Sequence, residues 1–136
     1  MCQNWSEARW DSLAYGRHLK GTRRKWGRNL VQDRTTWPNE PSQYNPNFSI
    51  ERIKTLEMEC ASGDPELGNF IQGNCRTKTF YRCVEEFDEF GGMIGVSRGE
   101  FTRYIFVTRQ SDGSVHGYPI TWDELVKNKG VKGDET

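Results

Sequence analysis

Long apolar runs, histidine and familiar catalytic motifs are all scarce in this sequence of 136 residues. No stretch approaches the ~20 apolar residues that a membrane span requires, and the N-terminus lacks the apolar segment of a secretion signal. With 34% hydrophobic residues and a mean hydropathy of −0.87, we expect a soluble domain without a membrane span. We expect its core to consist largely of aromatic side chains, since the chain has five Trp, five Tyr and seven Phe.

Several kinds of reactive site are also missing from the sequence. There is no phosphate-binding glycine loop before a helix, no Gly-x-Ser-x-Gly elbow and no His-Glu-x-x-His helix. The four cysteines form no Cys-x-x-Cys pair and lie far from either histidine, so no metal and no cofactor is predicted. Buried free thiols are the favoured state, and a Cys60–Cys75 or Cys75–Cys83 disulfide is the alternative.

Charge is balanced overall, with 19 basic and 19 acidic residues, but it is unevenly distributed. Residues 1–36 carry eight basic and three acidic residues, whereas residues 37–100 carry six basic and eleven acidic ones. The basic arm either contacts a polyanion such as RNA or folds onto the acidic middle of the chain, and both interpretations remain open. Its candidate nucleic-acid contacts are Arg23, Arg24 and Lys25, with His18 nearby as a candidate second proton carrier.

One domain is the expected organisation, because 136 residues are too few for two ordinary domains. Residues 1–36 are predicted to form a basic helical arm, with a helix over about 7–19, and residues 37–47 an extended linker rich in Pro and Asn. The α+β core spans 48–136. Its clearest helix covers 50–61, where Ser49 is the N-cap and Phe48 with Ile53 forms a hydrophobic staple.

Strands are indicated from Lys78 onward by aromatic and β-branched residues with a period of two. We expect one strand from Lys78, another within 91–97, and a hairpin of strands 101–109 and 115–120 joined at Ser111-Asp-Gly-Ser. Thr121 is placed to cap a helix that begins at Trp122. The predicted class is α+β, with N-terminal helices packed on a three- to four-stranded antiparallel sheet and a short C-terminal helix.

The stretch from Gly99 to Pro119 carries the strongest candidate site. Alternation places His116 and Tyr118 on one face of the return strand. The facing strand presents either Thr102 and Tyr104 or Arg103 and Arg109, and the register that decides between them is not fixed by the sequence. The ordinary alternative is a strand histidine without a catalytic role.

This combination of side chains suits metal-independent RNA cleavage. An imidazole such as that of His116 can take the ribose 2′-hydroxyl proton, and a cation such as Arg103 can stabilise the charged phosphorane. A hydroxyl from Thr102 or Tyr118 can orient the phosphate, while Arg109 is a candidate RNA contact. By contrast, the run Glu85-Glu-Phe-Asp-Glu is expected to be a solvated face, because its carboxylates are nearly consecutive and do not converge from separate elements.

Two blocks of the sequence carry a family resemblance: Phe90-Gly-Gly-Met-Ile-Gly-Val-Ser-Arg-Gly-Glu-Phe-Thr-Arg-Tyr-Ile and Asp112-Gly-Ser-Val-His-Gly-Tyr-Pro-Ile-Thr. They resemble the C-terminal toxin domains of bacterial polymorphic toxins, including those of contact-dependent inhibition systems. The resemblance implies a small ribonuclease-like effector, with a catalytic role for His116 helped by Thr102 and Arg103. It also implies a cognate immunity protein, an RNA substrate, and secretion within a larger protein that acts in the target-cell cytoplasm.

A second class of function remains open beside the toxin. This alternative is a non-catalytic module, an inhibitor or adaptor, that binds a protein or nucleic acid. In this interpretation the basic arm at 1–36 and the acidic run at 85–89 are the binding surfaces.

Overall fold

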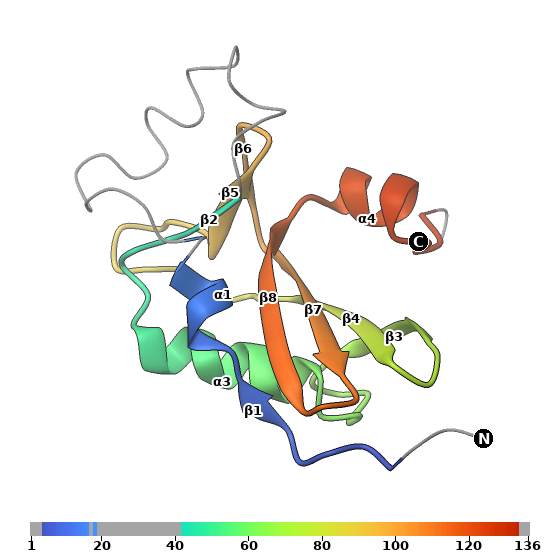
Figure 1. The fold of residues 1–136 in the computed structure, drawn as a ribbon. Helices are drawn as coiled ribbons and strands as arrows, with labels where there is room; N and C mark the ends of the chain where they lie inside the picture. Colours follow the sequence, from blue (N-terminus) through green and yellow to red (C-terminus); the bar gives the residue numbers. More distant parts are fainter. Residues whose placement is uncertain (1–3, 17, 19–41, 134–136) are drawn as a thin grey trace.

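A computed structural model describes residues 4–16, 18 and 42–133. Over these residues the fold is α+β, as the sequence predicts, with three helices, a five-stranded sheet and a separate three-stranded sheet (Figure 1). The helices are α1 (Ser12–Gly16), α3 (Ile50–Cys60) and α4 (Trp122–Asn128). The strands are β1 (Arg9–Trp10), β2 (Gln43–Tyr44), β3 (Asn69–Gly73), β4 (Thr77–Cys83), β5 (Gly95–Ser97), β6 (Glu100–Thr102), β7 (Tyr104–Gln110) and β8 (Ser114–Ile120).

The main sheet has the strand order β1-β8-β7-β4-β3, and the small sheet has the order β2-β5-β6. All neighbours are antiparallel except β1, which runs parallel to β8. The antiparallel centre of the main sheet matches the prediction. The prediction of three or four purely antiparallel strands is wrong, because the main sheet has five strands and β1 is parallel. The two strands of this sheet that were missed are β1, which pairs through two residues only, and β3, which is exposed along most of its length. Neither strand leaves a clear alternating pattern in the sequence.

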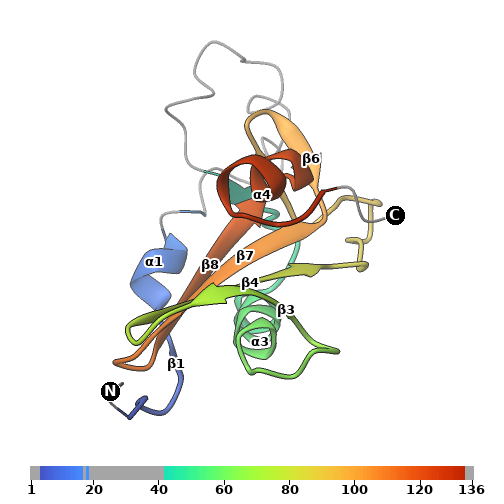
Figure 2. The same cartoon turned by 90° about the vertical axis from the view of Figure 1, so that its right-hand side faces the viewer.

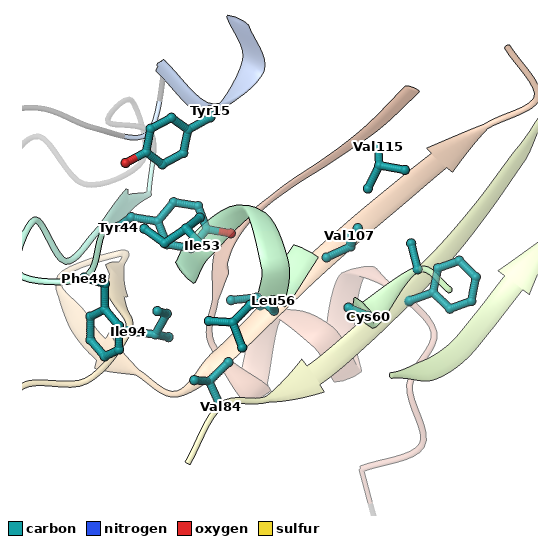
Figure 3. Packing of buried hydrophobic residues seen from close by; sticks show 13 residues of the cluster. Tyr15, Tyr44, Phe48, Ile53, Leu56, Cys60, Val84, Ile94, Val107 and Val115 are labelled. Atoms are coloured by element: carbon teal, nitrogen blue, oxygen red, sulfur yellow. The ribbon is translucent and has the colours of Figure 1, made fainter. Parts of the chain in front are cut away.

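Helix α3 covers one face of the main sheet, and the larger core lies between them (Figure 3). Ser49 caps the helix as predicted, because its hydroxyl accepts the Arg52 N–H at 3.1 Å. Phe48 and Ile53 are both buried in the same core, as the staple requires. The apolar side chains that meet α3 from the sheet come mainly from the odd-numbered residues of β7 and β8, such as Val107 and Val115.

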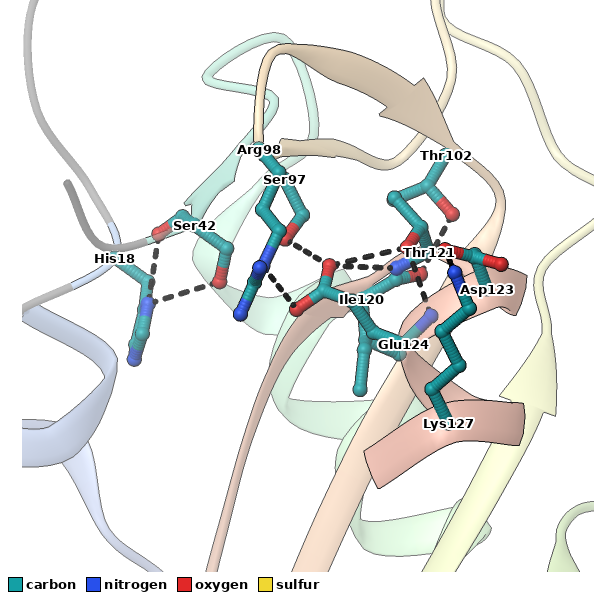
Figure 4. Close-up of polar contacts among 10 residues, drawn as sticks. All are labelled: His18, Ser42, Ser97, Arg98, Thr102, Ile120, Thr121, Asp123, Glu124 and Lys127. Carbon is teal, nitrogen blue, oxygen red and sulfur yellow. Dashed lines mark hydrogen bonds and ion pairs between the residues drawn. The ribbon is translucent and has the colours of Figure 1, made fainter. Parts of the chain in front are cut away.

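Helix α4 lies against the opposite face of the sheet, near the end of β8 (Figure 2). Thr121 and Glu124 form a reciprocal capping box at its start, so the predicted cap is confirmed. The Glu124 carboxylate also accepts the Ser97 hydroxyl at 2.6 Å and pairs with Arg98 at 3.2 Å (Figure 4). Arg98 stands in the β5–β6 turn with φ of 50°, a left-handed conformation, so Glu124 ties α4 to that turn.

The predicted helix over 7–19 is wrong in its bounds. The described part of this segment contains β1 and then α1, a helix of five residues. Asp11 begins the helix, because its carboxylate accepts the N–H groups of Leu13 and Ala14, both at 3.1 Å. Trp10 is drawn out of the helical pattern by a tertiary contact, since its indole N–H donates to Glu57.

The predicted linker over 37–47 and the single strand over 101–109 also need correction. Within the described part of the linker, Tyr44 is 1% exposed and belongs to β2, so this segment forms core. The strand is broken at Arg103, because the Thr102 hydroxyl accepts the Tyr104 N–H and donates to the Ile120 carbonyl at 2.7 Å. These two bonds turn the chain from the small sheet into the main one.

Cys60 is a buried free thiol and Cys83 an exposed free one, whereas Cys75 is disulfide-bonded. Both pairings considered from the sequence are therefore wrong, since each used one of the free cysteines. Among the residues that the structure describes, no helix has the length and apolar character needed to cross a membrane.

Candidate active site

The face of the main sheet opposite α3 carries the candidate site. Alternation along β8 puts His116, Tyr118 and Ile120 on this face. The register places Thr108 of β7 opposite His116 and Phe106 opposite Tyr118. The hydroxyl beside His116 is therefore that of Thr108.

Helix α4 divides this face into an apolar and a polar part. Under the helix lies a second apolar cluster whose core is Phe106, Ile120 and Leu125. Beyond it, Thr79, Thr108 and His116 stand in line across β4, β7 and β8, and each is half-buried. A polar row on a sheet face next to half-buried rings is suited to a polar substrate with flat groups.

His18 reaches the same face from the segment after α1. Its ring stacks on that of Tyr118, with centroids 5.3 Å apart and planes 22° apart. Its Nδ1 lies 2.7 Å from the carbonyl oxygen of Ser42, which can only accept, so Nδ1 is the donor (Figure 4). This bond fixes the ring orientation and, in the neutral form, leaves the lone pair on Nε2.

His116 differs from His18 in its partners. Its Nδ1 is buried and has no hydrogen-bond partner among the described residues. Because buried polar atoms are nearly always paired, this nitrogen is an exception, and the described protein groups leave the hydrogen bonding of His116 incomplete. Two residues along a strand span about 7 Å, so His116 and Tyr118 stand close enough to contact one small substrate group.

A cation also reaches this face, and it comes from the residue that follows α4. The ammonium of Lys129, the residue after α4, lies 4.6 Å from the centre of the Phe106 ring. Phe106 in turn contacts the Tyr118 ring, with centroids 5.4 Å apart. The cation–π contact therefore places a positive charge at the boundary between the apolar cluster and the polar row.

The structure separates most of the predicted helpers from His116. Thr102 is buried and its hydroxyl is committed to Ile120 and Tyr104, which makes its role structural. Arg103 is exposed, and its guanidinium lies 5.8 Å from the centre of the Phe87 ring. Of the residues predicted to act in catalysis, the structure brings together His116, Tyr118 and the candidate proton carrier His18 on this face.

Arg109, the predicted RNA contact that the structure describes, is not part of this face either. Arg109 projects to the α3 side of the sheet, where its guanidinium donates to the Ser6 carbonyl at 3.2 Å and lies 5.8 Å from the Trp5 ring centre. Arg23, Arg24 and Lys25 lie outside the described residues.

Sequence reasoning missed Thr108 and Lys129 as members of the site. Thr108 could have been found from strand alternation, because residues two apart share a face and Thr108 follows Phe106 by two positions. The hairpin turn sets the register that brings this face opposite His116. Lys129 left no such signal, since a lysine at the end of a helix has an ordinary role in complementing the helix dipole.

The acidic run at 85–89 is used for structure. Glu86 forms an ion pair with Arg52 of α3. Desolvation favours a raised pKa for Asp88, but donors from Asn47, Asn45 and the backbone N–H groups of Gly92 and Phe90 lower that pKa to about 2. Within the described ranges, no group of three or more His, Cys, Asp or Glu side chains is arranged to hold a metal ion.

Comparison with known proteins gives no assignment of this face. No protein-family model, no curated protein and no solved structure matches the chain.

Proposed function

We propose that the protein is a metal-independent ribonuclease of the toxin-effector type, with its active site on the open face of the main sheet. One observation carries the proposal: both histidines of the chain stand beside Tyr118 on this face. Thr108 lies opposite His116, and the Lys129 ammonium lies over Phe106, whose ring contacts Tyr118. The resemblance of the Phe90 and Asp112 blocks to polymorphic toxin domains supports the same function. The half-buried aromatic rings support a single-stranded RNA substrate, because unpaired bases stack on such rings.

The reaction needs two proton transfers and one stabilised anion. One imidazole takes the proton of the ribose 2′-hydroxyl, whose oxygen attacks the neighbouring phosphorus, and the bond from phosphorus to the 5′-oxygen breaks. The other imidazole, protonated, gives its proton to that 5′-oxygen, so the products are a 2′,3′-cyclic phosphate and a 5′-hydroxyl. Lys129 stabilises the charge on the non-bridging oxygens, and Thr108 donates a hydrogen bond to one of them.

The first test is cleavage of single-stranded RNA in the presence of EDTA, followed by gel analysis and by detection of the cyclic phosphate. His116→Ala is expected to lower the rate by roughly 10²–10⁴, the usual contribution of general acid–base catalysis, with an unchanged circular dichroism spectrum. Full activity in a correctly folded His116→Ala variant would contradict the proposal. RNA binding without any cleavage by the wild type would favour the binding module instead.

Two neighbouring lysines provide a matched test of the cation. Lys129→Met keeps the apolar part of the side chain over Phe106 and removes the charge, so we expect kcat to fall by roughly 10²–10³. Lys127→Met removes a charge from the same helix, but Lys127 is 70% exposed and pairs only with Asp123 among the described residues. Equal activities of the two variants would remove Lys129 from the mechanism.

A further inference from the structure

Glu57 lies in the middle of α3 and is fully buried, on the side of the sheet opposite the candidate site. Its carboxylate accepts the indole N–H of Trp10 at 2.8 Å, the hydroxyl of Tyr44 at 2.5 Å and the backbone N–H of Gly117. These donors belong to β1, β2 and β8, so one side chain joins three strands from both sheets. A buried carboxylate is unfavourable unless it is hydrogen-bonded, and three donors meet that need here.

The bond to Gly117 continues the ladder along the edge of β8. The N–H groups of Arg9 and Asp11 donate to the carbonyls of Gly113 and Val115, so odd-numbered residues of β8 direct their backbone groups to this edge. Strand β1 ends at Trp10, and no described strand pairs with Gly117 there. Glu57 supplies the acceptor that a longer β1 would otherwise supply.

Gly117 is suited to this approach because it has no side chain. A Cβ at this position would lie 2.7 Å from the Phe106 carbonyl oxygen and 3.2 Å from Cδ of Glu57. The residues on either side of Gly117 are His116 and Tyr118, whose side chains project to the other face of the sheet. The carboxylate of Glu57 and the candidate site are thus separated by the thickness of one strand.

We infer that Glu57 is a positioning residue for the site: by holding the Gly117 N–H, it fixes the backbone from which His116 and Tyr118 project. As far as it concerns activity, this inference rests on the proposed function. The hydrogen bond and its effect on the strand can be measured without any activity.

Ionisation of Glu57 provides a readout of the contact. Burial raises the pKa of Glu57, and the bonds from Tyr44, Trp10 and Gly117 oppose this effect, which leaves the pKa at about 7. The other titratable groups that face it are Tyr44 from β2, Tyr15 from α1, Asp11 before α1, and Cys60 on its own helix. Burial raises the pKa of both tyrosines and of the thiol, so these three stay protonated near neutral pH.

The experiment compares Glu57→Gln with Cys60→Ala in the full chain. Both residues are completely buried on α3, but Cys60 has no hydrogen bond to β8. In Glu57→Gln we expect amide hydrogen exchange at Gly117 to be roughly tenfold faster and kcat on RNA to fall roughly tenfold or more, with KM within about twofold. The wild-type Gly117 amide resonance is expected to shift with a midpoint near pH 7, and Glu57→Gln should abolish that shift. Cys60→Ala is expected to match the wild type in all of these measurements.

Unchanged exchange and an unchanged titration at Gly117 in Glu57→Gln would overturn the inference, as would an equal loss of kcat in Cys60→Ala. If Glu57→Gln does not fold, Tyr44→Phe removes only the hydroxyl that holds the carboxylate, and it should show the same effects at smaller size. If the wild type cleaves no RNA, the proposed function is wrong, and the exchange data alone decide whether Glu57 holds β8.

Discussion

Each polar side chain near the hairpin takes its role from what its atoms already contact. The Thr102 hydroxyl uses both its donor and an acceptor position within the fold, so it has little left for a substrate. His116 keeps a buried nitrogen without a partner in the described structure. Glu57 is the opposite case: its carboxyl group is fully buried, and both of its oxygens accept hydrogen bonds, from Trp10 and Tyr44.

Glu57 predicts a pH dependence of stability at the residue scale. Its pKa rises on folding from an ordinary 4.5 to about 7, so the folded state holds the proton more tightly. The resulting stabilisation is complete below about pH 4.5 and is lost as the pH rises through 7, by up to about 3 kcal/mol. Urea unfolding of the wild type and Glu57→Gln across this range should show the wild type losing stability relative to the variant. Parallel curves would contradict the prediction.

At the scale of elements, α4 joins the small sheet to the site. Its first turn is held by the capping box and by the contacts of Glu124 with Ser97 and Arg98, and the residue after its end is Lys129. The position of the Lys129 ammonium over Phe106 therefore depends on a helix of seven residues that is held by its cap and by the buried Leu125. Short helices of this kind are marginal without their caps.

Thr121→Ala removes the cap and is expected to destabilise the protein by about 1 kcal/mol, because the Glu124 N–H loses its acceptor. The same change should lower RNA cleavage, since the end of α4 carries Lys129. Thr121→Ser keeps the hydroxyl and is the control, with stability and activity near those of the wild type. Thermal unfolding and initial rates test both effects, and a stable but inactive Thr121→Ser would argue against capping as the cause.

For the whole molecule, the two sheets approach each other closely at Gly95 of β5 and Pro119 of β8. A Cβ on Gly95 would lie 2.3 Å from Cγ of Pro119 and 2.8 Å from the Gln43 carbonyl oxygen. Neither the proline ring nor the backbone of Gln43 can move away easily, because both residues are buried and Gln43 is paired with Val96 in the small sheet.

Gly95→Ala should therefore lower the unfolding free energy by roughly 1–3 kcal/mol through overpacking. Gly16→Ala is the matched control, because a Cβ there meets no atom within 4 Å. Denaturant unfolding of the two variants separates the close approach of the sheets from a general effect of replacing glycine. An equally stable Gly95→Ala would show that the sheets can move apart.

The sequence predicts local features of this molecule well and distant contacts poorly. Ser49 and Thr121 were found as caps because their partners lie three residues away, and the hairpin turn was found because Asp112-Gly113 is a local signal. The short β1, the Glu57 contacts and the Lys129 position could not be found, since each depends on residues far away in the chain. The face of His116 was predicted, but its neighbours required the register.

The residues of the candidate site are widely spaced along the chain, and this spacing has a consequence for protein synthesis. His18 leaves the ribosome early, His116 and Tyr118 follow late, and Lys129 emerges after the whole sheet has been synthesised. A nascent chain that stops before α4 has the imidazoles but neither the cation nor the helix that covers the aromatic rings. The complete candidate site therefore forms only after translation has passed this point. Under the proposed function, a ribosome engaged in making the chain does not carry a finished RNA-cleaving surface.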